Sequence, residues 1–263
     1  MFFSKTLFSA IAALALAVST PAFAQTIKLA VTAGPHAEIA EVVKSVAATK
    51  GLDITVVEFS EGTLINSVTD DGEVDANSFQ HTPWLEQQNK DRGLHVVAVG
   101  GPTVLLPMAG YSRKWKSLGD LPDGALVSLP GDPSNQARAL NLLAANGVLT
   151  LRDGVGYDAS EFDIVDNPKH LQFLPMENAQ LPRSLDDVDL SIIISSFAMR
   201  GGLEPGRDAL LIEGQGSTYF CLIGVAEKNK DAAWVATLVD AYKSPEVKDF
   251  IGKTYHGNIV TSW

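Results

Sequence analysis

Apolar residues recur along the first third of the chain with two spacings, one typical of strands and one of helices. Residues 26–31 form a short apolar run, and residues 52–59 alternate apolar with polar positions and are rich in β-branched side chains. Between these runs, residues 37–51 place apolar side chains at helical spacing and end at a glycine. Another apolar run follows at 95–99. Strands that alternate with helices in this way predict a mostly parallel sheet covered by helices.

A second unit with the same pattern follows. Its expected strands are residues 125–129 and 190–194, and residues 162–165 and 171–174 are candidate short strands. A helix is expected over residues 136–146, after a loop that contains two prolines and a glycine. The free N–H groups of such a helix start can bind an anion, and Arg138 is expected in its first turn.

The chain is expected to cross between the two units twice. The apolar run 219–225 predicts the returning strand, and two helical stretches then close the chain. We therefore expect lobe 1 to comprise residues 25–110 and 222–263, and lobe 2 to comprise residues 111–221. Two α/β units joined in this way predict a two-lobed clamshell, each lobe a mixed, mostly parallel sheet flanked by helices, with a ligand cleft where the carboxyl ends of the strands face each other.

The first 24 residues have the pattern of a cleaved signal peptide. Lys5 is their only charged residue, residues 7–18 are apolar, and Ala22-Phe23-Ala24 is a small-x-small cleavage signal. The apolar run is too short to span a bilayer comfortably. No cysteine stands at the cleavage site, so we expect an exported periplasmic protein that is not lipidated.

Charge and cysteine content narrow the class of protein further. The net charge is −11, from 20 basic and 31 acidic residues, and no basic stripe is visible, which argues against nucleic acid as a partner. Cys221 is the only cysteine, so no internal disulfide can form. Its apolar neighbours favour a buried, inert thiol.

Catalytic and metal-binding motifs are missing from the sequence. The five histidines show no HxxxH or HxH spacing, and no GxSxG, P-loop or GxGxxG motif occurs. We therefore expect neither an enzyme nor a bound metal or cofactor.

Two groups of residues remain as candidates for a binding site. Phe79 and His81 precede a helix that begins near Pro83, and they either cap and pack that helix or line a cleft. Arg138 is either a surface helix residue or the partner of an anionic ligand group, since a guanidinium pairs with a carboxylate through two hydrogen bonds.

Segments throughout the chain after residue 24 resemble those of a known family, in the same order. They are Thr32–His36, Asp75–Pro83, Asp91–Gly93, Ala109–Ser112, Asp132–Asn135, Asp153–Val155, Asn167–Lys169 and Gln180–Asp187. On these segments the chain resembles the NlpA/MetQ family, the substrate-binding proteins of methionine ABC importers. The resemblance implies a type II periplasmic-binding-protein clamshell that acts as a monomer with a membrane ABC permease as its partner.

The resemblance also implies site residues, and some of them are changed here. Members of the family hold an amino acid with a Phe, a His and an Arg, which correspond to Phe79, His81 and Arg138. A family Tyr corresponds to Gly62 or Thr63, and two family Asn residues correspond to Ile194 and Cys221. Ser195 or Ser196 could replace one of the missing amides.

These changes leave two ligand hypotheses open. In the first hypothesis, the ligand is methionine or a related small carboxylate. The alternative is a non-methionine ligand, such as a modified amino acid, a carboxylate without an amino group or another sulfur compound, because an unpaired buried ammonium is costly.

Overall fold

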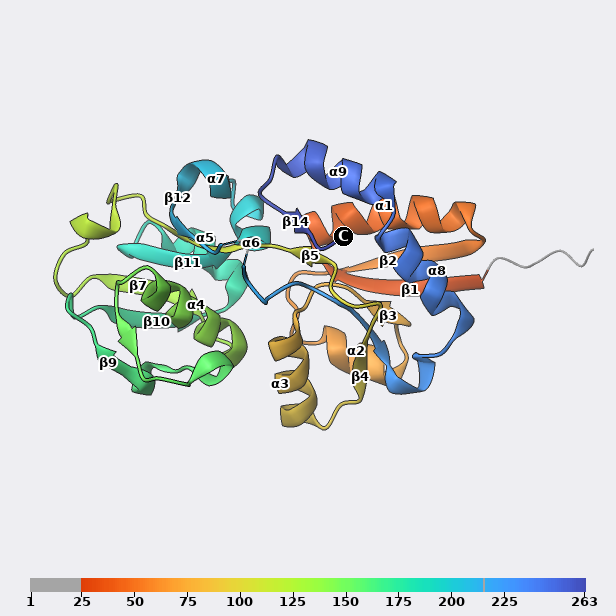
Figure 1. The fold of residues 1–263 in the computed structure, drawn as a ribbon, viewed down its shortest axis with the longest axis horizontal. Helices are drawn as coiled ribbons and strands as arrows, with labels where there is room; N and C mark the ends of the chain where they lie inside the picture. The colour runs from red at the N-terminus through yellow and green to blue at the C-terminus, as the bar shows by residue number, and fades with distance from the viewer. Residues whose placement is uncertain (1–24, 215) are drawn as a thin grey trace, which may run out of the picture.

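Two five-stranded sheets, one in each lobe, organise the computed structural model, which describes residues 25–214 and 216–263 (Figure 1). The expected signal peptide, Met1–Ala24, lies outside the described residues. Within the described ranges, no helix is long and apolar enough to cross a membrane. The α/β fold with two mixed, mostly parallel sheets flanked by helices confirms the fold class that the sequence predicts.

The sheet of lobe 1 has the order β2-β1-β3-β13-β4. Strand β1 runs parallel to both β2 and β3, whereas β13 runs antiparallel to its neighbours β3 and β4. Ile27, Leu29 and Val31 of β1 are at most 1 % exposed, as a central strand requires. The bounds are β1 Gln25–Thr32, β2 Leu52–Phe59, β3 Ala76–Asn77, β4 Val96–Val99 and β13 Ile223–Ala226.

Five α-helices belong to lobe 1 in the described part of the chain. They are α1 (Pro35–Thr49), α2 (Ile65–Asp71), α3 (Thr82–Arg92), α8 (Ala233–Tyr242) and α9 (Pro245–Tyr255). Helices α8 and α9 pack against α1, so the C-terminal part of the chain completes the lobe that the N-terminal part begins (Figure 1). A short 3₁₀ turn, Glu227–Asn229, precedes α8.

The sheet of lobe 2 has the order β10-β7-β11-β6-β12. Strand β7 is parallel to β10 and β11, whereas β6 is antiparallel to β11 and β12. The helices are α4, α5, α6 and α7, with 3₁₀ turns at Leu118–Asp120, Gly156–Asp158, Glu161–Asp163 and Asn178–Gln180. The bounds are β6 Met108–Tyr111, β7 Leu126–Pro130, α4 Pro133–Ala145, β8 Thr150–Leu151, β9 Ile164–Asp166, β10 Gln172–Met176, α5 Leu181–Ser184, β11 Leu190–Ile194, α6 Ser195–Arg200, α7 Pro205–Asp208 and β12 Ala209–Ile212.

Each sheet has one strand that opposes its neighbours, and it is the strand that follows a crossing. Before the first crossing, β5 (Val104–Leu105) pairs with the C-terminal strand β14 (Val260–Thr261). The chain then reaches β6, which is hydrogen-bonded within lobe 2. Residues 108–110 therefore pair with lobe 2 and not with lobe 1 as expected, because their backbone groups bond to β11 and β12.

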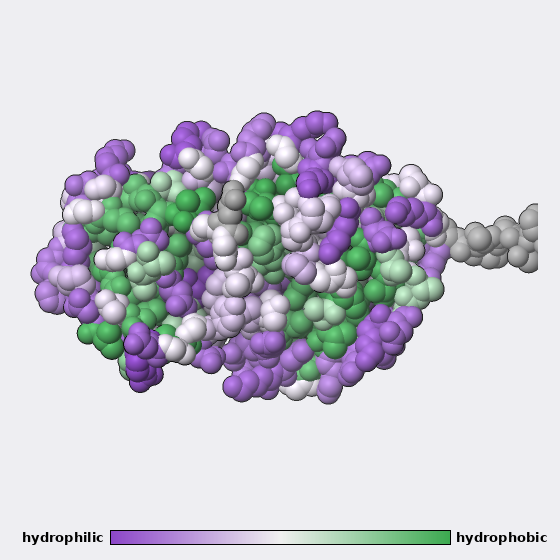
Figure 2. Space-filling view, in the orientation of Figure 1, coloured by the Kyte–Doolittle hydropathy of each residue, from purple (hydrophilic) through white to green (hydrophobic). Residues whose placement is uncertain are grey.

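The returning strand also differs from its expected range of 219–225. Only Ile223–Ala226 joins the sheet, and Cys221 forms an isolated bridge with His81. Apolar side chains fill a separate core in each lobe, and the face in Figure 2 shows polar residues along the outer edges of both lobes, with apolar residues between them.

Candidate ligand-binding site

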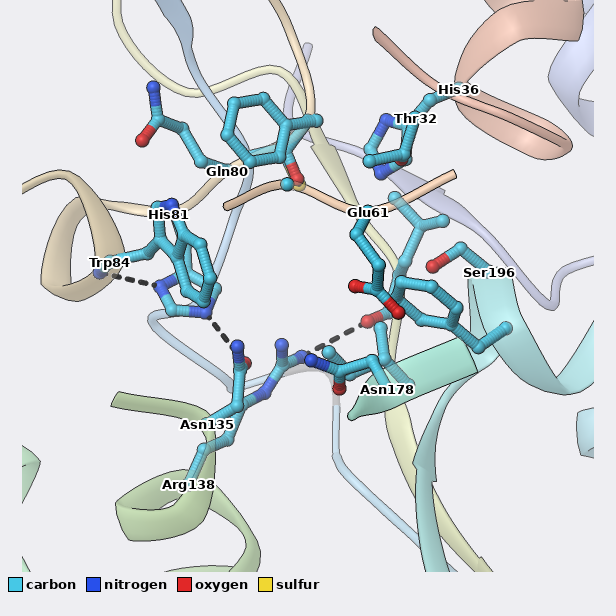
Figure 3. A pocket seen from close by; sticks show the side chains of 16 residues that line it. Thr32, His36, Glu61, Gln80, His81, Trp84, Asn135, Arg138, Asn178 and Ser196 are labelled. Carbon is cyan, nitrogen blue, oxygen red and sulfur yellow. Dashed lines mark hydrogen bonds between the residues drawn. The ribbon is translucent and has the colours of Figure 1, made fainter. Parts of the chain in front are cut away.

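A cavity lies between the lobes and is lined by residues of both (Figure 3). Its volume of ≈ 50 Å³ exceeds the space that one water molecule needs. The lining combines apolar and polar side chains, as small-molecule sites usually do. The residues are Thr32, His36, Glu61, Gly62, Phe79, Gln80, His81, Trp84, Leu106, Asn135, Arg138, Asn178, Ile194, Ser196, Phe197 and Cys221.

A buried amide network fixes the segment that carries Phe79 and His81. Gln80 exchanges two hydrogen bonds with Asn66, of 2.6 and 2.7 Å, and its Nε2 also donates to Asn77 Oδ1. The backbone N–H of Leu222 donates to the carbonyl oxygen of Gln80. Because buried amides need partners, these bonds hold the turn between β3 and α3 in one conformation.

His81 is held in one tautomer by its neighbours. Asn135 Nδ2 donates to both carboxylate oxygens of Asp132, so Asn135 Oδ1 is the atom that faces His81 Nε2 at 2.9 Å. An amide oxygen only accepts, and His81 Nε2 must therefore carry the proton. The other ring nitrogen, Nδ1, accepts from the backbone N–H of Trp84 and caps α3.

The N-terminus of α4 does not match its expected role as an anion site. The helix begins at Pro133, so Arg138 lies in its second turn, not its first. Asp132 is the N-cap, and its carboxylate accepts the N–H of Asn135 at 2.8 Å. The helix start already holds a negative charge from the chain itself, which removes the reason for a second anion there.

Arg138 reaches the cavity from this helix, but its charge is already paired. Its Nε donates to Glu213 Oε1 at 3.1 Å, and its Nη2 donates to Glu213 Oε2 and to the carbonyl oxygen of Leu106. The guanidinium carbon lies 4.6 Å from the ring centroid of Tyr219. Nη1 hydrogen-bonds to none of the described residues and is the donor that remains for a ligand.

Burial keeps two histidines of the cavity neutral. It lowers the pKa of His36 to about 4. It also lowers the pKa of His81 to about 3, with a further contribution from the positive charge of Arg138. Burial raises the pKa of the Cys221 thiol to about 12, so this sulfur stays protonated and is a poor nucleophile.

Three polar side chains, Glu61, Asn178 and Ser196, lie on another side of the cavity (Figure 3). Glu61 belongs to the turn between β2 and α2, whereas Asn178 and Ser196 belong to lobe 2. Burial raises the pKa of Glu61. Its Oε1 accepts the backbone N–H of Ala179 at 2.6 Å, which joins the two lobes.

Hydrogen bonds hold the lobes together around the cavity. Besides the bonds of Glu61 and His81, Arg200 Nη1 donates to the carbonyl oxygen of Ser60 at 3.1 Å. The side chain of Arg200 also lies so close to Gly34, which has a φ of 85°, that a Cβ there would be 2.7 Å from its Cγ. The lobes are therefore in direct contact.

Five of the six site residues expected from the sequence line the cavity. They are Phe79, His81, Arg138, Ile194 and Cys221. Ser195 does not, because it is fully buried and its hydroxyl donates to the carbonyl oxygen of Pro107. Ser196 takes its place in the lining.

The resemblance implies a family tyrosine at Gly62 or Thr63, and at Gly62 a neighbouring ring fills the space. Gly62 lines the cavity, whereas Thr63 is exposed. A Cβ on Gly62 would lie 2.4 Å from Cε2 of Phe79. The missing side chain at position 62 thus leaves the space into which Phe79 turns.

Four residues that shape the site were not expected from the sequence: Glu61, Asn135, Asn178 and Glu213. The N-cap spacing from Asp132 to Asn135 was a usable signal. Glu213 follows Arg138 by 75 residues, and no sequence pattern connects the two.

Comparison of the sequence with known proteins identifies the family to which this chain belongs. The NlpA lipoprotein family model matches residues 27–263. The D-methionine-binding lipoprotein MetQ of Escherichia coli K12 is 45% identical over 240 residues, which cover 90% of this chain and 88% of MetQ. The fold and site thus define a two-lobed solute-binding protein. The chain belongs to the NlpA lipoprotein family.

Solved structures show the same architecture. A nutrient-binding protein from Burkholderia cenocepacia bound to methionine superposes with a TM-score of 0.88 at 45% identity, covering 90% of this chain and all of that one (100%). A periplasmic substrate-binding protein of an ABC transporter from Coxiella burnetii gives a TM-score of 0.87 at 39% identity, with the same coverages of 90% and 100%.

Proposed function

We propose that this protein is the periplasmic receptor of an ABC importer and binds methionine, or a small carboxylate related to it, between its lobes. The observation that carries this proposal is the cavity that brings Phe79 and His81 of lobe 1 together with Arg138 of lobe 2. Family relatives named for methionine binding and for ABC transport support the ligand and the partner.

In this proposal each retained residue has a physical role. Arg138 Nη1 donates to the ligand carboxylate, while Glu213 holds the rest of the guanidinium in place. Phe79 packs against the ligand side chain. His81, fixed as the Nε2–H tautomer, joins the lobes through Asn135 and sets the shape of the closed site.

Binding, and not catalysis, is the activity that fits these groups. Cys221 keeps its proton, and its sulfur donates to the carbonyl oxygen of Phe79 at 3.7 Å. Neither ring nitrogen of His81 is free to act as a base, because Nδ1 accepts from Trp84 and Nε2 donates to Asn135. Ligand-dependent closure of the lobes would then be the signal to a permease.

A second candidate is a receptor of the same family for a ligand other than methionine. Ile194 and Cys221 favour it, because these positions correspond to two family amides and neither side chain replaces their hydrogen bonds. We further propose that Met1–Ala24 is cleaved on export and that the protein is not lipidated, since the residue directly after Ala24 is Gln25 and not a cysteine.

The direct test identifies the ligand. Native mass spectrometry of protein purified from its own host should show a bound small carboxylate, and calorimetry should show saturable binding of D- or L-methionine to the ligand-free protein. Binding of an unrelated carboxylate alone would favour the second candidate. Absence of any small-molecule binding would refute both.

A further inference from the structure

A polar atom of one cavity-lining side chain is buried and has no hydrogen-bond partner among the described residues. Asn178 is 6 % exposed and lines the cavity, and its Oδ1 has no hydrogen-bond partner among the described residues. Its Nδ2 donates to Asp132 Oδ2 at 3.2 Å. Since a carboxylate oxygen only accepts, this bond fixes which end of the amide is the oxygen. An unpaired buried acceptor calls for a donor from a ligand.

A carboxylate lies beside this acceptor. The N–H of Ala179, the residue after Asn178, donates to Glu61 Oε1 at 2.6 Å. Glu61 forms no ion pair with any described residue, and Arg200 directs its Nη1 to the carbonyl oxygen of Ser60 instead. Figure 3 shows the Glu61 carboxylate extending into the cavity on the side of Ser196 and Asn178.

The remaining charges of the cavity cancel or are absent. The positive charge of Arg138 is paired with Glu213, and burial keeps His36 and His81 neutral. Glu61 is therefore the charged residue of the lining without an ion-pair partner among the described residues. Burial raises the pKa of its carboxyl, and the nearby charge of Arg200 opposes this only in part. A cation with N–H donors, placed between Glu61 and Asn178, would neutralise the carboxylate and give the amide oxygen a hydrogen-bond donor.

We propose that Glu61 and Asn178, with the Ser196 hydroxyl beside them, form a subsite for a primary ammonium group of the ligand. An ammonium has three N–H donors, and this subsite offers carboxylate, amide and hydroxyl oxygens. The inference rests on the proposed receptor function and deepens it. It assigns amine recognition to residues other than the two positions, Ile194 and Cys221, where the family resemblance implies amides.

The subsite also links amine recognition to lobe contact. Glu61 comes from lobe 1, and Asn178 and Ser196 come from lobe 2. An ammonium bound to all three strengthens the junction that the Glu61–Ala179 hydrogen bond already makes. A ligand without an amine cannot bridge the lobes in this way.

The test compares pairs of ligands that differ only by the amine. Titration calorimetry would measure L-methionine, D-methionine and the desamino analogue 4-(methylthio)butanoate on wild type, Glu61→Gln, Asn178→Leu and the control Glu177→Gln. Glu177 is exposed, close to Glu61 and outside the cavity lining. Both Gln substitutions keep the shape of the side chain, and thermal melting would confirm that every variant folds.

We expect Glu61→Gln to weaken methionine binding by at least about tenfold and Asn178→Leu by about threefold or more, because each removes an acceptor of a charged hydrogen bond. Neither variant should weaken binding of the desamino analogue, and Glu177→Gln should stay within about twofold of wild type. The two methionine enantiomers differ in where they place the amine, so Glu61→Gln should affect the tighter enantiomer more.

Two results would overturn the inference while leaving the receptor function intact. One is wild-type protein that binds the desamino analogue as tightly as methionine. The other is a Glu61→Gln variant that binds methionine as well as wild type. A wild-type protein that binds none of the three compounds refutes the methionine receptor itself, and the subsite falls with it.

Discussion

The cavity has two polar walls, and they differ in how many of their polar groups form hydrogen bonds within the protein. On the paired wall (His81, Asn135 and Arg138), both ring nitrogens of His81 and the carboxylate of Glu213 are engaged in hydrogen bonds within the chain. On the open wall (Glu61, Asn178 and Ser196), the amide oxygen of Asn178 has no partner among the described residues, and the Glu61 carboxylate accepts a backbone hydrogen bond from Ala179 but forms no ion pair with any of them.

A single carboxylate produces this difference. Asp132 accepts from the amide nitrogens of both Asn135 and Asn178 and so turns both amide oxygens away from itself. The oxygen of Asn135 meets His81 across the cleft, whereas the oxygen of Asn178 meets no donor in the described part of the chain. The paired wall is therefore suited to holding the structure, and the open wall to selecting the ligand.

The largest expected effect tests the paired wall. Glu213→Gln leaves the buried guanidinium of Arg138, which is 3 % exposed, without its counter-charge. Removing one partner of a buried ion pair typically costs about 3–5 kcal/mol. Urea unfolding should show a loss of about 3 kcal/mol for Glu213→Gln.

A matched substitution on the open wall gives the contrast. Glu61→Gln should leave the free energy of unfolding within about 0.5 kcal/mol of wild type, since Glu61 forms no ion pair with a described residue and Gln can still accept the N–H of Ala179. Equal losses for the two variants would show that the walls do not differ in this way.

The elements that position these walls were largely foreseeable from sequence. Helix α1 forms where the apolar residues have helical spacing after a proline, and β1 and β2 form where the sequence patterns predict strands. Short elements such as α6 and β12 were missed, because six and four residues are too few to show a period.

The polar contacts of the site were not foreseeable in the same way. Phe79, His81 and Arg138 were expected to line a cleft, but the pairing of Arg138 with Glu213 depends on how β12 folds beside α4. The orientation of Asn178 depends on Asp132, which lies 46 residues earlier. Side-chain hydrogen bonds between distant segments have no sequence period, so only the folded chain reveals them.

The next largest expected effect is a decrease in the free energy of unfolding at low pH, and it involves both cavity histidines. Their folded pKa values, about 4 for His36 and about 3 for His81, lie below the ordinary value of 6.5. The unfolded chain therefore takes up more protons as the pH falls, so stability is greatest above pH 6.5 and decreases toward these folded pKa values. Between pH 6.5 and 5.5 each histidine should lower the free energy of unfolding by on the order of 1 kcal/mol.

Single substitutions separate the two contributions. His81→Gln and His36→Gln should each flatten the dependence of unfolding free energy on pH. Because Arg138 adds to the effect of burial at His81, proton NMR should find that His81 titrates at a lower pH than His36. A steep acid response that persists in the double variant would assign it to carboxylates instead.

The last expected effect is on ligand affinity and concerns the apolar positions between the walls. An Ile194→Asn/Cys221→Asn double variant adds two amides where family resemblance implies them, and we expect methionine affinity to rise by about threefold to tenfold, or up to about 1.4 kcal/mol. The gain is limited because Cys221 is 5 % exposed, and a buried amide must find partners in the absence of ligand. Calorimetry would compare this variant with an Ile194→Val/Cys221→Ala control, which adds no hydrogen-bonding group.

The double variant also tests the open wall. Its new amides would share the ligand ammonium with Glu61, so Glu61→Gln should reduce methionine affinity less in the double variant than in wild type. A loss of methionine binding in the double variant would instead mean that the ligand needs apolar contact at these positions, which favours a ligand other than methionine.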